Sequence, residues 1–186
     1  MLALSTSEAA VDRARYHHGD LRNALLQAAG ALLRTGGIDA VSLREAARAA
    51  GVSHNAPYRH FPSREALLAA LAAEGFRALR ARVENAGGMG LSALGRAYVA
   101  FAVEERALFL LMFGSGLDRA AFPEVAKAGG AARAGLDRAA SGRENADGPV
   151  PPGTLRAWAL AHGLAHLVAD GLLSADDAAR ALAEVP

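Results

Sequence analysis

Three polar residues in succession, Ser53, His54 and Asn55, carry hydrogen-bond donors and acceptors that suit the edges of nucleic-acid bases. Arg44 also has a side chain long enough to reach a base edge. Four residues nearby have groups that suit backbone phosphates: Ser42, Tyr58, His60 and Arg64. Residues 13–64 carry eight arginines against three acids, which indicates an anionic partner. Together these features predict contact with double-stranded DNA.

Helices must position these residues. The first is predicted for residues 20–35, where leucine and alanine recur at helical spacing and a glycine pair ends the pattern. A second begins at Ser42, which forms with Glu45 the S-x-x-E pattern of a capping box, and it ends at Ala50. Each of these two side chains is expected to bond a backbone N–H of the first turn.

A tight turn containing Gly51 joins the second helix to a third, which is predicted for residues 54–61 and is capped by Ser53. Pro57 is tolerated there only within the first turn of the helix. Two short helices joined by such a turn have the layout of a helix-turn-helix. The start of its second helix is the part that reads bases in the major groove.

The composition predicts an all-α protein, because alanine makes up about a quarter of the chain and β-branched residues are scarce. We expect a flexible N-terminal arm at residues 1–18, a DNA-binding head at 19–65 and a helical effector-binding and dimerisation domain at 66–186. After the head, Ser63 is expected to open one helix, and a second is expected at 92–113. One or two weaker helices are expected at 117–140, with breaks near Pro123 and Gly129-Gly130, followed by a loop at 141–153. The last two expected helices are one at 154–172 and a short one opened by Ser174.

Large apolar side chains recur at helical spacing in the second domain. They form either plain core or the wall of an apolar effector pocket: Tyr98, Phe101, Phe109, Met112 and Phe113. Trp158 and His162 lie one helical turn apart and complete the predicted pocket, where His162 offers a single orienting hydrogen bond. The spacing of His162, His166 and Asp170 would also fit a metal ion, but no cysteine or further histidine accompanies them.

Other function classes find no support in the sequence. The absence of cysteine excludes disulfide frameworks and thiolate chemistry. No glycine-rich phosphate loop after a strand and no nucleophile signature is present, so we expect neither an enzyme nor a cofactor. The longest apolar run, Leu108–Phe113, is far shorter than a membrane span, and residues 1–14 do not read as a signal peptide. A cytoplasmic location is therefore expected.

The segment from Tyr16 to Leu71 resembles the TetR family of bacterial transcriptional regulators. The likeness rests on GDLRNALLQAAGALLRTGGIDAVSLREAARAAGVS followed by PYRHFPSREALLAAL. The YRHF unit, followed by a basic residue and then Glu-Ala-Leu-Leu, is specific to the family when it comes after such a first helix. The chain departs from the usual pattern at two positions, where Arg64 replaces a lysine and Pro57 precedes the tyrosine in place of leucine or valine.

The resemblance implies roles for the same residues of the head. Those facing the major groove would be Arg44, Ser53, His54 and Asn55, and those holding phosphates would be Ser42, Tyr58, His60 and Arg64. The later segments ALFLLMFG and WALAHGLAHLVADG look like one subgroup, which is marked by Trp158, His162 and Gly163. This likeness implies a helical ligand pocket and a homodimer formed by the last two long helices. Four apolar residues of the 154–172 helix are expected to form the dimer face: Leu160, Leu164, Leu167 and Val168.

Two functions remain open at this point. The first is a homodimeric DNA-binding regulator, most often a repressor, that an unknown small-molecule effector releases from a palindromic operator. The alternative is a small helical binding or sensor protein, with or without a metal or cofactor, that does not read DNA sequence. The dependence of DNA affinity on salt separates the two, because only phosphate contacts make it steep.

Overall fold

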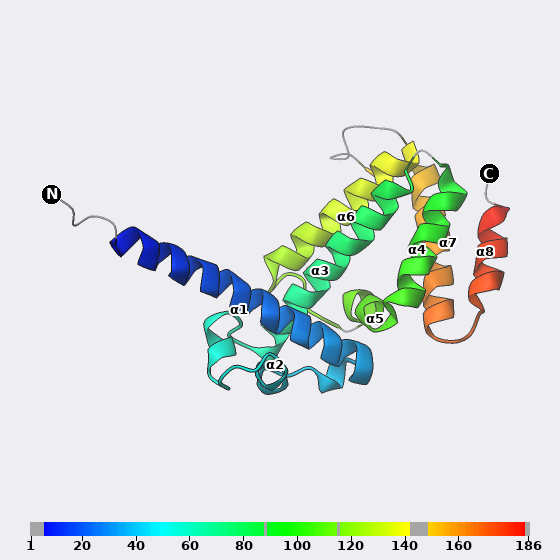
Figure 1. Ribbon diagram of the computed structural model, residues 1–186. Coiled ribbons are helices and arrows are strands. Elements are labelled where there is room, and N and C mark those ends of the chain that lie inside the picture. Colours follow the sequence, from blue (N-terminus) through cyan, green and yellow to red (C-terminus); the bar gives the residue numbers. More distant parts are fainter. Residues whose placement is uncertain (1–5, 88, 115, 142–148, 185–186) are drawn as a thin grey trace. The chain divides into compact units, whose positions relative to one another are not determined.

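The computed structural model describes the backbone of residues 6–87, 89–114, 116–141 and 149–184, and the side chains of these residues from Leu21 onward. Every regular element in these ranges is a helix, which confirms the all-α class (Figure 1). The chain divides into two compact units, residues 1–68 and 69–186. Helix α3 (Arg64–Asn85) begins in the first unit and continues into the second.

Helix α1 (Thr6–Gly36) starts much earlier than the helix predicted at 20–35. Residues 6–18 of the expected flexible arm are therefore helical, and residues 1–5 lie outside the described range. The sequence from Thr6 to Tyr16 is rich in alanine and arginine and contains neither glycine nor proline, so nothing local stops the helix. At the other end Gly37 takes a positive φ of 71° and closes the helix through a bond from its N–H to the carbonyl of Leu33.

The core of the first unit lies between α1, the short 3₁₀ turn η1 (Ile38–Ala40) and α2 (Leu43–Ala49). One stripe of α1 faces α2, and the buried side chains that meet there are Leu25, Leu26, Ala29, Leu33, Val41, Leu43, Ala46, Ala47 and Phe61. Gly36 permits the chain to turn tightly, since a Cβ placed on it would lie 2.6 Å from the Cβ of Ala40.

The turn after α2 has the geometry that the helix-turn-helix requires. Gly51 has a φ of 68°, its N–H bonds the carbonyl of Arg48, and the N–H of Val52 bonds the carbonyl of Ala47. These two bonds form a Schellman motif, in which a left-handed residue satisfies the last carbonyls of a helix. Because glycine adopts this conformation at little cost, Gly51 fixes the direction in which the chain leaves α2.

The predicted recognition helix at 54–61 is wrong in type and extent, because the structure has a single 3₁₀ turn, η2 (Ala56–Arg59). Pro57 explains the difference. It has no N–H to donate, and its ring opposes an α-helical bond to the carbonyl of Ser53, which instead accepts from Ala56. The Pro57 ring is buried, and its carbonyl accepts from the N–H groups of His60 and Phe61.

In the second unit, the helix predicted at 92–113 is divided into α4 (Leu91–Glu104) and α5 (Arg106–Gly114). No glycine or proline marks this division, so tertiary packing produces it. The change of direction at Glu105 leaves both Phe101 and Phe109 fully buried. It also lets the guanidinium of Arg106 donate to the carbonyl of Ala169.

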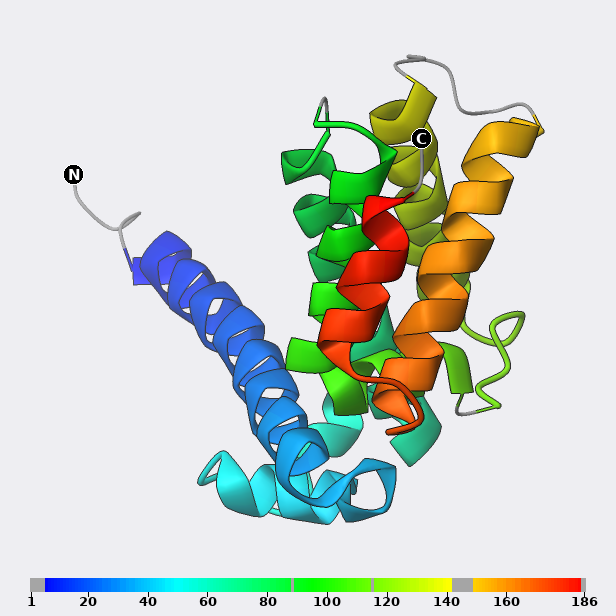
Figure 2. The ribbon, with the colours of Figure 1, turned by 90° about the vertical axis from the view of Figure 1, so that its right-hand side faces the viewer.

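Helix α6 (Pro123–Ser141) runs unbroken through Gly129-Gly130, where the sequence predicted a break. Helices α7 (Pro152–Ala169) and α8 (Ala175–Ala183) follow, and α4, α7 and α8 lie side by side (Figure 2). Ser174 caps α8 as predicted, since its hydroxyl accepts from the N–H of Asp177. Of the expected loop at 141–153, residues 142–148 lie outside the described range. None of the helices in the described ranges is both long and apolar enough to cross a membrane.

Candidate functional site

The residues expected to read bases lie on the surface of the first unit. Arg44 is exposed at the start of α2, and Ser53, His54 and Asn55 are exposed in the turn that leads into η2. The buried Pro57 and the Schellman turn at Gly51 fix the backbone on both sides of this turn. The three polar side chains are therefore displayed by a turn rather than by the first turn of an α-helix.

The residues expected to hold phosphates have different surroundings. Tyr58 is 57% exposed, whereas Ser42 and His60 are half-buried. The Ser42 hydroxyl accepts from the N–H of Glu45 at 3.1 Å, which is one half of the predicted capping box. The other half, a bond from the Ser42 N–H to the Glu45 carboxylate, is not among the hydrogen bonds of the described residues, and the carboxylate instead pairs with Arg48 at 2.6 Å.

Arg64 is the residue whose surroundings differ most from the expectation. Its Nε donates to the carbonyl of Val41 at 2.7 Å, and its Nη2 donates to the carbonyl of Ile38 at 2.6 Å. The half-buried guanidinium thus ties the first residue of α3 to the segment between α1 and α2. We call this arrangement the Arg64 clamp.

Two arginines of the head were missed by sequence reasoning. Arg59 is exposed in η2 next to Tyr58, and Arg22 lies with its guanidinium 5.2 Å from the centre of the Phe61 ring. Arg59 adds positive charge in the element that directly follows the polar turn. The charge excess of residues 13–64 contained this signal, but spacing alone could not separate exposed arginines from clamped ones.

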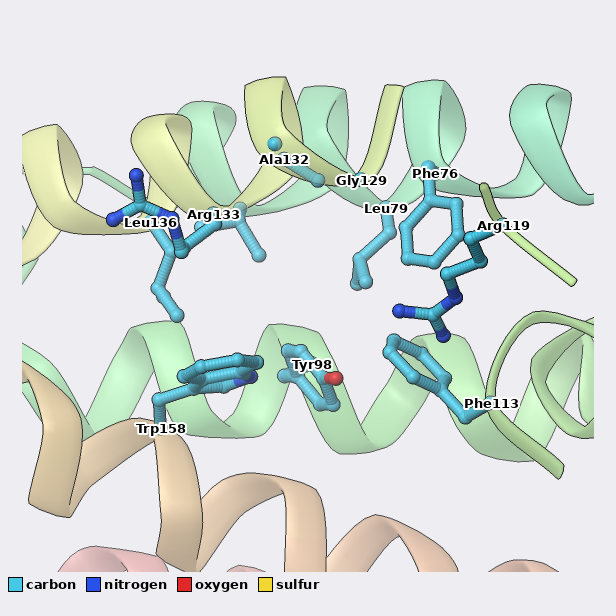
Figure 3. A pocket seen from close by; sticks show the side chains of 12 residues that line it. Phe76, Leu79, Tyr98, Phe113, Arg119, Gly129, Ala132, Arg133, Leu136 and Trp158 are labelled. Atoms are coloured by element: carbon cyan, nitrogen blue, oxygen red, sulfur yellow. The ribbon is translucent and has the colours of Figure 1, made fainter. Parts of the chain in front are cut away.

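The second unit contains a cavity of about 250 Å³ between α3, α6 and the helices α4, α5 and α7 (Figure 3). Most of its wall is apolar or aromatic. The lining residues are Phe76, Leu79, Val83, Tyr98, Phe113, Arg119, Gly129, Gly130, Ala132, Arg133, Leu136 and Trp158. Figure 3 shows Trp158, Tyr98 and Phe113 along one side, with Phe76 and Leu79 facing them.

Of the residues expected to form a pocket, Tyr98, Phe113 and Trp158 line this cavity. The other apolar candidates, Phe101, Phe109 and Met112, are core residues with at most 3% of their surface exposed. The sequence could not separate the two groups, because one helical stripe supplies both. It also missed the contribution of α3, α6 and the segment that contains Arg119.

His162 lies beside the cavity lining. Its Nδ1 and the hydroxyl of Tyr98 form a hydrogen bond of 2.9 Å, and its ring centre is 4.7 Å from that of Phe113. Burial, the neighbouring His166 and the charge of Arg119 lower the pKa of His162, which favours the neutral imidazole. Burial raises the pKa of Tyr98, so the phenol keeps its proton.

The metal alternative gains no support from this cluster. The rings of His162 and His166 are 4.6 Å apart, yet the described residues contain no group of three or more potential ligands that could hold an ion. Both histidines instead contact aromatic rings, with His166 4.9 Å from Phe109. The i, i+4 spacing places both histidine rings against aromatic side chains.

The outer face of α7 carries exposed apolar side chains. Leu160 and Leu167 are 39% and 42% exposed, and the exposed Gly163 lies between them on the same face. Leu164, which the sequence assigned to the dimer face, is buried within the chain, and Val168 is half-buried. The exposed face therefore consists of only part of the expected set.

The head is a helix-turn-helix with an exposed polar turn, and one helix joins it to a helical unit with an apolar cavity. This combination is typical of DNA-binding transcriptional regulators. Comparison with protein families places the chain among them. Residues 25–71 match the model of bacterial regulatory proteins of the tetR family, and residues 91–185 match that of the tetracyclin repressor-like C-terminal domain. The chain belongs to the TetR family of transcriptional regulators, a family of regulators rather than of enzymes.

Solved structures share the fold of this chain. A protein of unknown function from Rhodococcus sp. RHA1 is 39% identical, with a TM-score of 0.73 over 89% of this chain and 93% of that one. A TetR transcriptional regulator from the same organism shares the fold at 21% identity, with a TM-score of 0.63 over 91% and 94% of the two chains. The regulator LfrR from Mycobacterium smegmatis, solved in complex with proflavine, shares it at 24% identity, with a TM-score of 0.58 over 91% and 98%. No curated protein matches the chain.

Proposed function

We propose that this chain is a repressor that binds a palindromic operator as a homodimer and leaves it when a small molecule fills the cavity of the second unit. One observation carries the proposal. Helix α3 supplies Phe76, Leu79 and Val83 to the cavity wall, and its first residue forms the Arg64 clamp in the head. A ligand that moves this helix therefore acts on the DNA-binding unit through a continuous backbone.

In the proposed complex, the exposed turn enters the major groove. Ser53, His54 and Asn55 meet base edges together with Arg44, and Tyr58 holds a phosphate. Ser42 and His60, which are half-buried, contribute to the phosphate contacts at the rim. The exposed Arg59 joins them, since a guanidinium beside an exposed tyrosine suits a DNA backbone.

The proposed dimer uses the outer face of α7 together with α8. Leu160 and Leu167 are exposed there, and Gly163 has no atom within 4 Å of an added Cβ, so a second helix can approach closely. A two-fold dimer presents two heads to two half-sites, which lie about 34–36 Å apart on one face of DNA. The homodimer thus matches a palindromic operator.

The proposed control is a shift between two populations of the dimer. In one population the two heads are spaced to fit the operator, and in the other they are not. A ligand that binds the second form more tightly increases its population. The regulator LfrR has the same fold and was solved in complex with proflavine, which supports a small-molecule ligand for a protein of this fold. A bacterial regulator of this kind works on DNA in the cytoplasm, which is the location that we propose.

The experiment combines an operator selected from random DNA with the full-length protein. We expect tight, sequence-dependent binding whose affinity falls steeply with salt, because several phosphates are contacted. A ligand that releases the DNA should change the emission of Trp158, the single tryptophan, and His162→Ala should weaken that response. DNA binding that is weak and indifferent to sequence would refute the proposal, and release without a change in emission would place the effector elsewhere.

A further inference from the structure

We infer that the cavity of the second unit selects an apolar organic anion, such as an aryl carboxylate, over neutral and cationic molecules of the same shape. Its wall carries two guanidinium groups, those of Arg119 and Arg133, and no aspartate or glutamate of the described chain lines it. Unbalanced positive charge in a mostly apolar enclosure favours a ligand that supplies the negative charge. The naming of this ligand as an effector rests on the proposed function, whereas the charge preference does not.

Arg119 is held in place with most of its donors free. Its guanidinium lies 5.4 Å from the ring centre of Phe76 and 5.8 Å from that of Phe113. Its Nη2 donates to the carbonyl of Met112 at 2.7 Å. A guanidinium has five N–H donors, and stacking on aromatic faces leaves those at its edge available to an acceptor. Arg119 is thus oriented before a ligand arrives.

Arg133 lacks the partner that neighbouring arginines have. On the same two helices, Arg80 of α3 and Arg138 of α6 both pair with Glu84, at 2.9 and 2.7 Å. Arg133 is half-buried and makes no ion pair or hydrogen bond with another residue that the structure describes. A half-buried cation of this kind gains from an anion that bonds it in two places, as a carboxylate does.

The size and shape of the cavity restrict the body of the ligand. The volume of about 250 Å³ exceeds the cavity of about 150 Å³ that holds one benzene ring, and it lies below the range of about 300–1,000 Å³ for drug-sized molecules. Trp158, Tyr98 and Phe113 face Phe76 and Leu79 across it (Figure 3). A flat body of two fused rings fits between these sides. Figure 3 places the two arginines near opposite ends, so an acidic group at one end of the rings meets a guanidinium.

The test compares three probes of one shape on the full-length protein at pH 7.5: 2-naphthoate, 2-naphthamide and 2-naphthylmethylamine. Calorimetry and Trp158 emission measure the affinities. We expect the carboxylate to bind at least about tenfold more tightly than the amide, because it forms charge-assisted hydrogen bonds, and the amine to bind most weakly. Arg133→Gln should remove most of this preference, Arg133→Lys should retain part of it, and Arg119→Gln should reduce it. Arg156→Gln, an exposed arginine of α7 away from the cavity, is the matched control and should change nothing.

Equal affinity for carboxylate and amide, tighter binding of the amine, or no binding of any probe would overturn the inference. The inference would also fail if Arg133→Gln and Arg119→Gln preferred the carboxylate over the amide as strongly as the wild type does. The proposed function is tested separately with operator DNA. If naphthoate binds selectively but leaves DNA affinity unchanged, the anion preference stands and the effector role of such anions fails. If the protein does not bind DNA specifically, the proposed function fails while the probe comparison still decides the inference.

Discussion

Replacing Arg64 separates two roles that one residue could have in the head. The sequence assigned it to a DNA phosphate, whereas the structure shows it bonded to the carbonyls of Val41 and Ile38. Hydrogen bonds to a charged group contribute about 1.5–3 kcal/mol each, and the half-exposed site places these two at the lower end. We therefore expect Arg64→Ala to destabilise the protein by about 2–3 kcal/mol, which corresponds to roughly 5–10 °C in Tm for a chain of this size.

The informative variant is Arg64→Lys. Lysine keeps the charge that a phosphate needs but cannot donate to both carbonyls in the fixed geometry of a guanidinium. If the clamp is the main role, this variant loses about half of the stability that alanine loses, and amide exchange rises in residues 37–43. Urea unfolding followed by circular dichroism measures the first effect, and hydrogen exchange with mass spectrometry measures the second. Arg59→Lys is the matched control in the same unit, because Arg59 is exposed, and it should leave both unchanged.

The salt dependence of DNA affinity provides the second readout. Loss of one phosphate contact lowers the slope of log affinity against log salt by about 0.9, whereas loss of a clamp weakens binding without changing the slope. We expect Arg64→Ala to bind DNA more weakly with an unchanged slope. A variant as stable as the wild type whose slope falls by about one would refute the clamp and restore the phosphate contact.

Four further outcomes are expected. Asn55→Ala should cost about 1–3 kcal/mol on the operator and little on scrambled DNA, as gel shifts can measure, because a base contact carries sequence preference. Leu167→Glu should yield monomers in sedimentation at micromolar concentration, whereas Val103→Glu, at an equally exposed apolar site on α4, should not. The free energy of unfolding should fall as the pH drops below about 6.5. The reason is that the pKa of His162 is lowered in the folded state, so the unfolded chain takes up a proton more readily. His162→Gln should flatten this part of the pH profile. Gly130→Ala should raise the free energy of unfolding by about 1 kcal/mol, because the site lies inside α6 and has no atom within 4 Å of an added Cβ.

Each of these expectations has a result that would contradict it. Equal losses on operator and scrambled DNA would remove Asn55 from the bases, and a dimer of Leu167→Glu would move the interface elsewhere. A pH profile in His162→Gln identical to that of the wild type would show that other groups control the acid limb. A less stable Gly130→Ala would mean that the glycine meets a constraint of the backbone.

Local signals in the sequence were sufficient for the features that depend on local chemistry. The Gly51 turn and the caps at Ser42 and Ser174 form because a glycine or a hydroxyl satisfies backbone groups a few residues away. Whether the exposed residues contact DNA stays a prediction. The all-α class followed from alanine content in the same way, since propensity accumulates over long windows.

Features that depend on distant residues could not be predicted. The division at Glu105 has no local breaker, and the Arg64 clamp joins groups 23 and 26 residues apart. Helix α6 continues unbroken through Gly129 and Gly130. The packing of the helical residues before and after this pair therefore outweighs the cost of about 1 kcal/mol that each glycine adds. The cavity likewise depends on which residues of one aromatic stripe border a gap once the side chains of α3 and α6 are in place.

The turn that carries Ser53, His54 and Asn55 has a consequence for how the proposed operator preference changes over time. Its shape is maintained by neighbours, the buried Pro57 ring and the Gly51 motif, and the three exposed side chains take no part in the core. Substitutions at these positions are therefore nearly neutral for folding, as surface changes usually are. In the proposed complex, where these side chains meet base edges, duplicated copies of such a gene could therefore diverge in the DNA that they bind without a loss of stability. The same independence makes residues 53–55 the positions to exchange first in an experiment that tests the proposed base contacts.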